Sequence, residues 1–147
     1  MVVDVVELEL RKSHQIDIDL DDVPIYLAES AARLFCREIG RLNVEHVAML
    51  ALGTDNRPAN FFIVSAGEID SVRVSLAQMF RCALLSNATK MMVAHNHPSG
   101  VLEVTSNDIK MTKKIGYVAD CLGIELLDSL VVTGDGYVSI RARCKEL

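Results

Sequence analysis

The pattern of hydrophobic and polar residues predicts strands and helices that alternate along the chain. Runs that are rich in β-branched residues, or apolar without interruption, are typical of strands covered on one or both faces. Such runs occupy residues 2–10, 45–53, 60–67, 89–95 and 124–140. The last run contains Gly134 and Gly136 around Asp135, which predict a hairpin turn where the glycines take positive φ. Residues 14–22 fit either a short edge strand or a solvated loop.

Apolar residues spaced three or four apart predict three amphipathic helices. The first covers residues 24–40, with Pro24 in its first turn and its end near Gly40; the second follows Ser75, and the third ends at Gly123. Their expected buried positions are Leu27, Ala31, Leu34 and Phe35, then Leu76, Met79, Phe80, Ala83 and Leu84, and finally Met111, Ile115, Val118, Ala119 and Leu122. Because strands and helices are interleaved, we expect a single α/β domain with one mixed sheet flanked by helices.

The composition narrows the classes of function. A chain of 147 residues is the size of one domain, and 50% hydrophobic with 24% charged residues is typical of a folded soluble protein. The formal net charge of -5 argues against a general nucleic-acid surface, and no run approaches the roughly 20 apolar residues of a membrane span. Residues 1–12 mix acids with valines, so we expect them not to act as a secretory leader.

The four cysteines are widely spread, and no two form a C-x-x-C pair. They are Cys36, Cys82, Cys121 and Cys144. We therefore expect free thiols, a reducing cytoplasmic location and no zinc site made of cysteines.

Two histidines lie one residue apart at the end of the strand predicted for residues 89–95, in the sequence HNHPSG. Side chains alternate along an extended chain, so His95 and His97 point the same way and can chelate one ion. If Thr105 or Ser106 caps the next helix, Asp108 lies in its first turn, where its carboxylate can reach back towards the histidines. Two histidines and one aspartate leave a tetrahedral position open to water, as in catalytic zinc sites. The set suits Zn²⁺, although other divalent ions also fit.

Each of these residues also has an ordinary structural explanation. A single His-x-His is more often a pair of surface histidines than a metal site. Thr105 and Asp108 have the spacing of a helix capping box, in which the helix dipole also favours the acid. Only the combination of three side chains at this spacing favours a metal site.

A hydrolytic site of this kind needs a general base, and Glu45 is one candidate. It opens the strand predicted for residues 45–53 and could project into a site at the end of a neighbouring strand. A strand-terminal acid in solvent is the commoner situation, and His46, Glu68 and His14 are alternatives. Sequence spacing alone does not choose among them.

The order of these residues resembles one known family. EHVAML, the later ALLSNATKMMVAHNHPSG and a following S/T-x-x-D are similar to RadC-like JAB domains, a branch of the JAMM (MPN-plus) metallopeptidases. The family pattern is a glutamate, a distant H-x-H and then S-x-x-D, and its positions are taken here by Glu45, His95, His97, Thr105 and Asp108. The similarity runs from about Glu45 to Ile140. It implies a cytidine-deaminase-like fold with a core at residues 45–147, to which a strand and helix in residues 1–44 are added within the same domain.

The resemblance also implies a zinc-dependent hydrolase that cleaves a peptide or isopeptide amide bond in a peptide or protein substrate. His95, His97 and Asp108 would be the zinc ligands, and Glu45 would be the base that activates the zinc-bound water. The hydroxyl of Thr105, or of Ser106 beside it, would stabilise the oxyanion.

The sequence departs from the family pattern at several points. Thr105 replaces the usual serine, and VRVSLAQ at residues 72–78 replaces an HPRE-like stretch that is common in RadC proteins. We find no counterpart of the N-terminal helix-hairpin-helix region of those proteins. The association of the family with DNA repair therefore gains no support from these residues.

Two other hypotheses concern the function of the same site, and a third concerns the oligomeric state of the protein. A zinc-binding module could dock a partner in DNA repair or mobile-element biology without peptidase turnover. Zinc-dependent nucleobase deamination would need H-x-E and P-C-x-x-C motifs, which the sequence lacks. The apolar run at residues 2–10 could pair across a homodimer interface or cover a sheet edge within one chain, and we expect a dimer.

Overall fold

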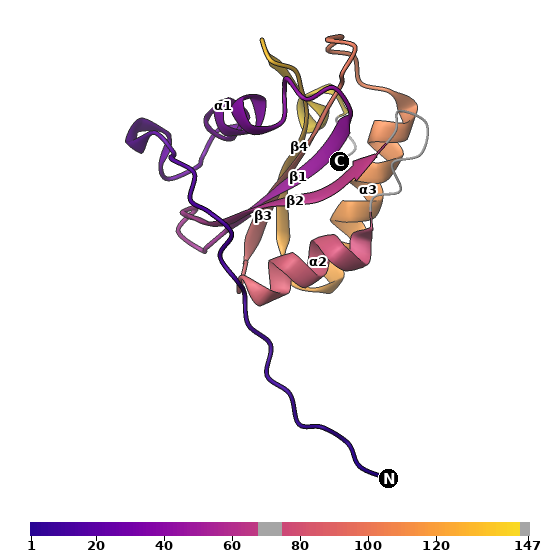
Figure 1. The fold of residues 1–147 in the computed structure, drawn as a ribbon. Coiled ribbons are helices and arrows are strands. Elements are labelled where there is room, and N and C mark those ends of the chain that lie inside the picture. The colour runs from indigo at the N-terminus through magenta and orange to yellow at the C-terminus, as the bar shows by residue number, and fades with distance from the viewer. Residues whose placement is uncertain (68–74, 145–147) are drawn as a thin grey trace.

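The computed structural model describes residues 1–67 and 75–144, and within them five strands form one mixed sheet in the order β2-β1-β3-β4-β5 (Figure 1). The strands are β1 (Glu45–Leu52), β2 (Pro58–Gly67), β3 (Lys90–Asn96), β4 (Glu125–Val132) and β5 (Tyr137–Ser139). Strand β1 pairs antiparallel with both β2 and β3, β3 pairs parallel with β4, and β4 pairs antiparallel with β5.

Helices cover both faces of this sheet (Figure 1). They are α1 (Ala28–Glu38), α2 (Leu76–Leu85) and α3 (Ser106–Cys121), with a 3-10 turn η1 (Leu20–Asp22) before them and a short α4 (Ile140–Arg143) after β5. Helix α1 packs on one face, and α2 and α3 pack on the other. The prediction of a single α/β domain with a mixed sheet flanked by helices is therefore confirmed. Among the residues that the structure describes, no helix is both long and apolar enough to cross a bilayer.

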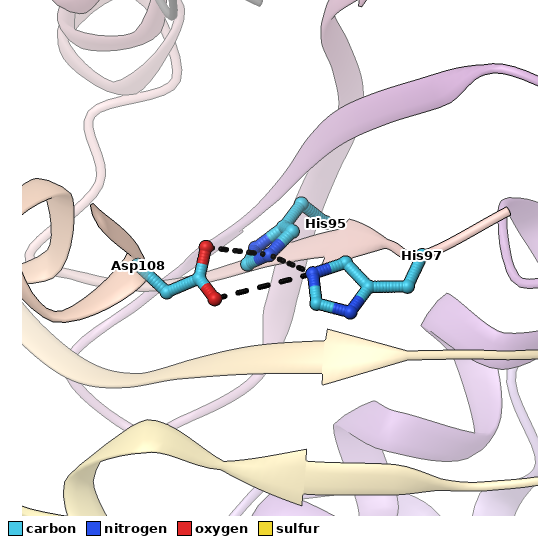
Figure 2. Close-up of side chains that lie close together, drawn as sticks. All are labelled: His95, His97 and Asp108. Carbon is cyan, nitrogen blue, oxygen red and sulfur yellow. Dashed lines mark hydrogen bonds and ion pairs between the residues drawn. The ribbon is translucent and has the colours of Figure 1, made fainter. Parts of the chain in front are cut away.

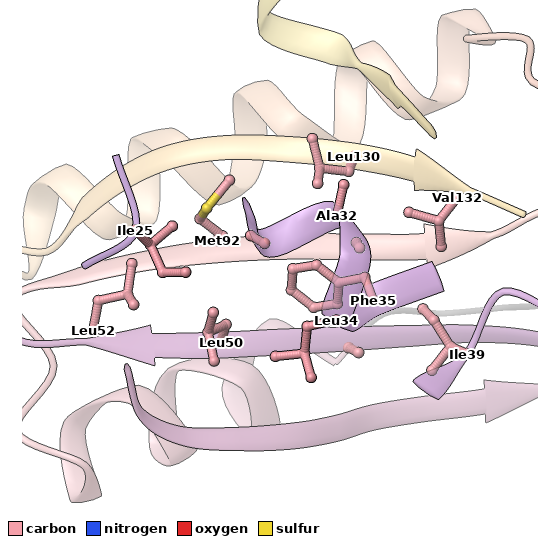
Figure 3. Close-up of a cluster of buried hydrophobic side chains, with 13 residues drawn as sticks. Ile25, Ala32, Leu34, Phe35, Ile39, Leu50, Leu52, Met92, Leu130 and Val132 are labelled. Carbon is pink, nitrogen blue, oxygen red and sulfur yellow. The ribbon is translucent and has the colours of Figure 1, made fainter. Parts of the chain in front are cut away.

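Strand β1 contributes to the hydrophobic core on both of its faces. Leu50 and Leu52 (Figure 3), together with Ala48, pack with α1. Val47 and Met49 pack with α2 and α3. This explains the continuous apolar run in its sequence, since a strand buried on both faces does not alternate with polar residues. Truncation of a fully buried leucine at such a position costs about 2–5 kcal/mol of stability.

The strand predicted for residues 2–10 is wrong. Residues 1–19, all of them described, contain no helix or strand, and the large apolar side chains of residues 2–10 are exposed. A β-branched composition favours an extended backbone, but a strand forms only when its N–H and C=O groups pair with a neighbour. Residues 14–19 form a loop and not an edge strand, with Ile16 and Ile18 packed partly against the core beneath α1, and residues 20–22 form the 3-10 turn η1.

The first helix begins later than predicted. Pro24 precedes the helix, because the chain first buries Ile25, whose N–H donates to the carbonyl of Asn56, and only then starts α1 at Ala28. Leu27, predicted to be buried, is exposed, and so are Leu84 in α2 and Leu122, which follows the last residue of α3.

The hairpin between β4 and β5 is present, but its glycines do not take positive φ. The turn is closed by the N–H of Thr133, which donates to the carbonyl of Gly136 at 2.8 Å. Glycine is needed for space beside this turn at position 40, since a Cβ there would lie 2.3 Å from the backbone carbonyl oxygen of Thr133. The four cysteines are free thiols, as expected.

Candidate metal centre

Three polar side chains meet where β3 ends and α3 begins (Figure 2). His95 is in β3, His97 follows its last residue, and Asp108 lies in the first turn of α3. Nε2 of His95 is 3.2 Å from Nε2 of His97 and 3.1 Å from Oδ1 of Asp108, and Nε2 of His97 is 3.9 Å from Oδ2 of Asp108. The structure thus brings together the three side chains that the sequence analysis selected as ligands.

These separations fit one metal ion. In a tetrahedral zinc site with bonds of 2.0–2.2 Å, neighbouring donor atoms lie about 3.3 Å apart. The donor atoms of His95, His97 and Asp108 all lie within 4.8 Å of one another. The exposed fractions of the His95, His97 and Asp108 side chains are only 11%, 18% and 14%. The group is therefore sheltered but still reachable from solvent. It could therefore hold a metal ion.

A hydrogen bond outside the group orients His97. Nδ1–H of His97 donates to the carbonyl oxygen of Val101 at 3.0 Å. A carbonyl oxygen only accepts, so this contact assigns the proton to Nδ1 and leaves Nε2 with a free lone pair. Such outer contacts commonly fix the tautomer and ring orientation of metal-binding histidines.

Asp108 also forms the capping box of α3, so the ordinary explanation of this residue and the ligand explanation hold together. Its Oδ2 accepts hydrogen bonds from the Thr105 N–H at 2.7 Å and the Thr105 hydroxyl at 2.8 Å, while Oγ1 of Thr105 accepts from the Asp108 N–H at 3.2 Å. Oδ1 remains directed at His95. The carboxylate thereby closes the helix and faces the histidines.

The same contacts keep Asp108 ionised. Burial alone would raise the pKa of this carboxyl, but the interaction with His95 and the hydrogen bonds from Thr105 outweigh it and lower the pKa to about 2. Asp108 is therefore an anionic donor throughout the neutral range, as a metal ligand must be.

Strand pairing places Glu45 on the same face of the sheet as the histidines. Val47 lies directly opposite His95 in the β1–β3 pair, and Glu45 is two residues from Val47, so its side chain points to the same side. Glu45 and the three candidate ligands line one cavity of about 450 Å³. The cavity continues over Val93 and Ile115 towards the core beneath α3.

The alternative bases lie elsewhere or outside the described residues. His46 follows Glu45 on β1, so its side chain points to the opposite face, and its Nδ1–H donates to the carbonyl of Val44 at 2.8 Å. His14 is exposed in the N-terminal segment. Glu68 lies outside the described residues, and so do the first residues of the 72–78 stretch that departs from the family pattern.

The two hydroxyls proposed for the oxyanion have different positions. Thr105 lines the cavity, but its hydroxyl donates to Asp108; Ser106 is exposed and does not line the cavity. Ser99, Asn107 and Ser129 line the cavity and were missed by the sequence analysis. The only sequence signal for Ser129 is that it and Asp128 interrupt the apolar run of β4.

The fold and the site together indicate the general class of protein. A mixed five-stranded sheet with helices on both faces, and a His-His-Asp group where a strand end meets a helix start, are consistent with a JAB/MPN-like domain. Sequence comparison gives the particular family: residues 25–146 match the RadC-like JAB domain, and the chain belongs to this family. This match begins about 20 residues before Glu45, the residue at which the similarity of the sequence motifs begins.

Three similar curated proteins are named as UPF0758 proteins. The chain is 34% identical over 134 residues to a UPF0758 protein of Finegoldia magna, covering 91% of this chain and 57% of the relative. It is 32% identical over 120 residues to one of Chloroflexus aurantiacus (82% and 52%), and 29% identical over 136 residues to the UPF0758 protein lmo1549 of Listeria monocytogenes (92% and 61%). The chain thus spans little more than half the length of these relatives.

Proposed function

We propose that this domain is a zinc-dependent hydrolase that cleaves a peptide or isopeptide amide bond. The observation that carries the proposal is the convergence of Glu45, His95, His97 and Asp108 on one cavity from three separate elements. An imidazole-imidazole-carboxylate set with an adjacent second carboxylate is the donor set of a hydrolytic zinc site, and the membership in the RadC-like JAB family supports the same chemistry.

His95, His97 and Asp108 would hold the ion, with His97 oriented by Val101 and Asp108 by Thr105. Zinc in such a site polarises the substrate carbonyl and lowers the pKa of water towards about 7. Glu45 would accept a proton from the attacking water and deliver it to the nitrogen of the departing amine, which then leaves as a neutral group.

The oxyanion needs a hydrogen-bond donor as charge develops on the carbonyl oxygen. Thr105 could serve if its hydroxyl turned from Asp108 towards the substrate, and such a donor is worth about 3 kcal/mol in comparable sites. Ser106 would first have to move into the cavity, because it is exposed outside it. We therefore favour Thr105 for this role.

The test combines metal analysis with turnover. Protein purified without added metal is analysed for zinc and assayed on a panel of peptide and isopeptide-linked substrates, with and without a chelator. We expect about one zinc per chain in the wild type, its loss in His97→Ala, and a Glu45→Gln variant that keeps zinc but not turnover. Glu103→Gln is the matched control, since Glu103 is an exposed acid that does not line the cavity.

Two results would count against the proposal. Full turnover by Glu45→Gln would remove the base. Bound zinc with no chelator-sensitive turnover across the panel would favour the partner-docking module instead.

A further inference from the structure

Asn96, the residue between the two histidines, has its side chain on the opposite face of the sheet and is completely buried. Its Oδ1 accepts a hydrogen bond from the N–H of His46 at 2.6 Å. Its Nδ2 donates to the carbonyls of Leu42 and Val44, both at 3.1 Å. Every partner is a backbone group, and the partners lie on both sides of Glu45.

The hydrogen bonds of the Asn96 side chain lie just beyond the end of the backbone pairing between β1 and β3. Backbone pairing between β1 and β3 ends at Val47 and His95, so the ladder between these strands does not reach Glu45. On its other side, Glu45 is paired with Gly67 at the end of β2. The side chain of Asn96 is therefore what connects the backbone around Glu45 to the strand that carries the histidines.

We propose that Asn96 is a positioning residue, which fixes Glu45 relative to the metal-binding side chains of His95 and His97. The role rests on the proposed function in two respects, namely that Glu45 is the base and that His95 and His97 bind the ion. Because His95, Asn96 and His97 are consecutive, the histidines face the ion while the residue between them holds the segment that carries the base. The distance between base and ligands is thus set within one short stretch of β3.

The amide suits this role and its closest replacements do not. Asparagine supplies one acceptor and two donors, which match the N–H of His46 and the two carbonyls. Aspartate has the same shape but would set a carboxylate against the carbonyls of Leu42 and Val44. Alanine would leave all three backbone groups without this partner.

The experiment compares wild type with Asn96→Ala and Asn96→Asp, and uses Asn60→Ala as the matched control. Asn60 is an asparagine of β2 that bonds to Ser86, and it pairs with Ala51, near the end of β1 remote from Glu45. The first readout is amide hydrogen exchange in metal-free protein. In Asn96→Ala we expect exchange at His46 to be roughly tenfold faster or more, with exchange at Leu50 unchanged.

The second readout uses Co²⁺ as the probe. The visible absorption of bound Co²⁺ reports which side chains bind it. The paramagnetic relaxation that Co²⁺ causes at the ¹³C-labelled Glu45 carboxyl reports the distance between the ion and that carboxyl. In both Asn96 variants we expect unchanged Co²⁺ absorption with altered relaxation at Glu45, whereas Asn60→Ala changes neither. A merely structural role would not alter the relaxation selectively.

The outcomes separate this inference from the proposed function. Unchanged exchange at His46, or unchanged relaxation at Glu45, overturns the role of Asn96. If both Asn96 variants fail to fold, the residue is structural and the inference is also overturned. If wild type binds no Co²⁺, the proposed function fails, and hydrogen exchange alone decides whether Asn96 holds this segment.

Discussion

Nε2 of His95 lies 3.1 Å from Oδ1 of Asp108, which joins the end of β3 to the first turn of α3. The contact depends on the loop between these elements, because neither residue is near the other in sequence. Because Asp108 both faces His95 and caps α3, we expect some substitutions here to affect metal binding, some to affect the stability of α3, and some to affect both.

Replacement of Asp108 by asparagine should abolish most metal binding. The neutral amide still fills the space and can accept from the Thr105 N–H, but it lacks the charge that the donor set requires. Zinc content by elemental analysis should fall from about one per chain to near zero. Asp120→Asn, an exposed substitution near the other end of α3, should bind zinc like wild type. Equal zinc in Asp108→Asn and wild type would exclude Asp108 as a ligand.

Thr105→Val should weaken both the start of α3 and the metal site. It removes the hydroxyl that accepts from the Asp108 N–H and donates to Oδ2, so we expect a loss of about 1 kcal/mol in urea unfolding. Zinc affinity, measured by chelator competition, should fall about tenfold, as for other residues that orient a ligand. Thr105→Ser should restore both, and Ser106→Ala should change neither. A Thr105→Val protein with wild-type stability would show that this cap is not needed.

The contribution of Asp22 to stability should depend on pH. The Arg33 guanidinium, which donates from Nε to Oδ2 of Asp22 at 3.0 Å, lowers the pKa of this buried carboxyl. A carboxyl with a lowered pKa in the folded state stabilises the protein above its unfolded value of about 3.9, and this stabilisation is lost as pH falls through the folded value.

The measurement is urea unfolding of wild type and Asp22→Asn at pH 7 and at pH 3. The difference in unfolding free energy should be larger at pH 7. Asp21→Asn, at an exposed neighbouring position, should show little difference at either pH. A difference that grew on acidification would contradict the direction of the shift.

Removal of residues 1–12 should leave the stability of the domain unchanged within about 0.5 kcal/mol, because these residues are exposed and have no regular structure. The homodimer expected from the sequence stays a prediction, and this deletion tests the segment's part in it. Light scattering after size exclusion should show a dimer for the full chain and a monomer for the deletion. Identical masses would remove the segment from any interface.

The sequence alone predicted those features of the fold and the site that depend on residues close together in the chain. The apolar run of β1 predicts a strand covered on both faces, and the spacing of Thr105 and Asp108 predicts a cap that the structure contains. The alternation around His95 and His97 correctly indicates that both imidazoles face one side. These are properties of neighbours in the chain.

Other features depend on partners distant in sequence. Residues 2–10 have a strand-like composition, but only a paired neighbour could have made them a strand. The requirement for glycine at position 40 comes from the backbone of Thr133, and the burial of Asn96 comes from the backbone around Glu45. Nothing in the residues adjacent to Asn96 indicates those hydrogen bonds.

The two duties of Asp108 affect how other members of this family should be interpreted. A protein that had abandoned metal chemistry would still benefit from this carboxylate at the beginning of its helix, so an aspartate here says little about whether an ion is bound. Among the contacts described, His97 also bonds to the carbonyl of Val101, whereas the ring of His95 contacts only the other two members of the group. Whether a relative still binds metal should therefore be judged first from its residue at the position of His95.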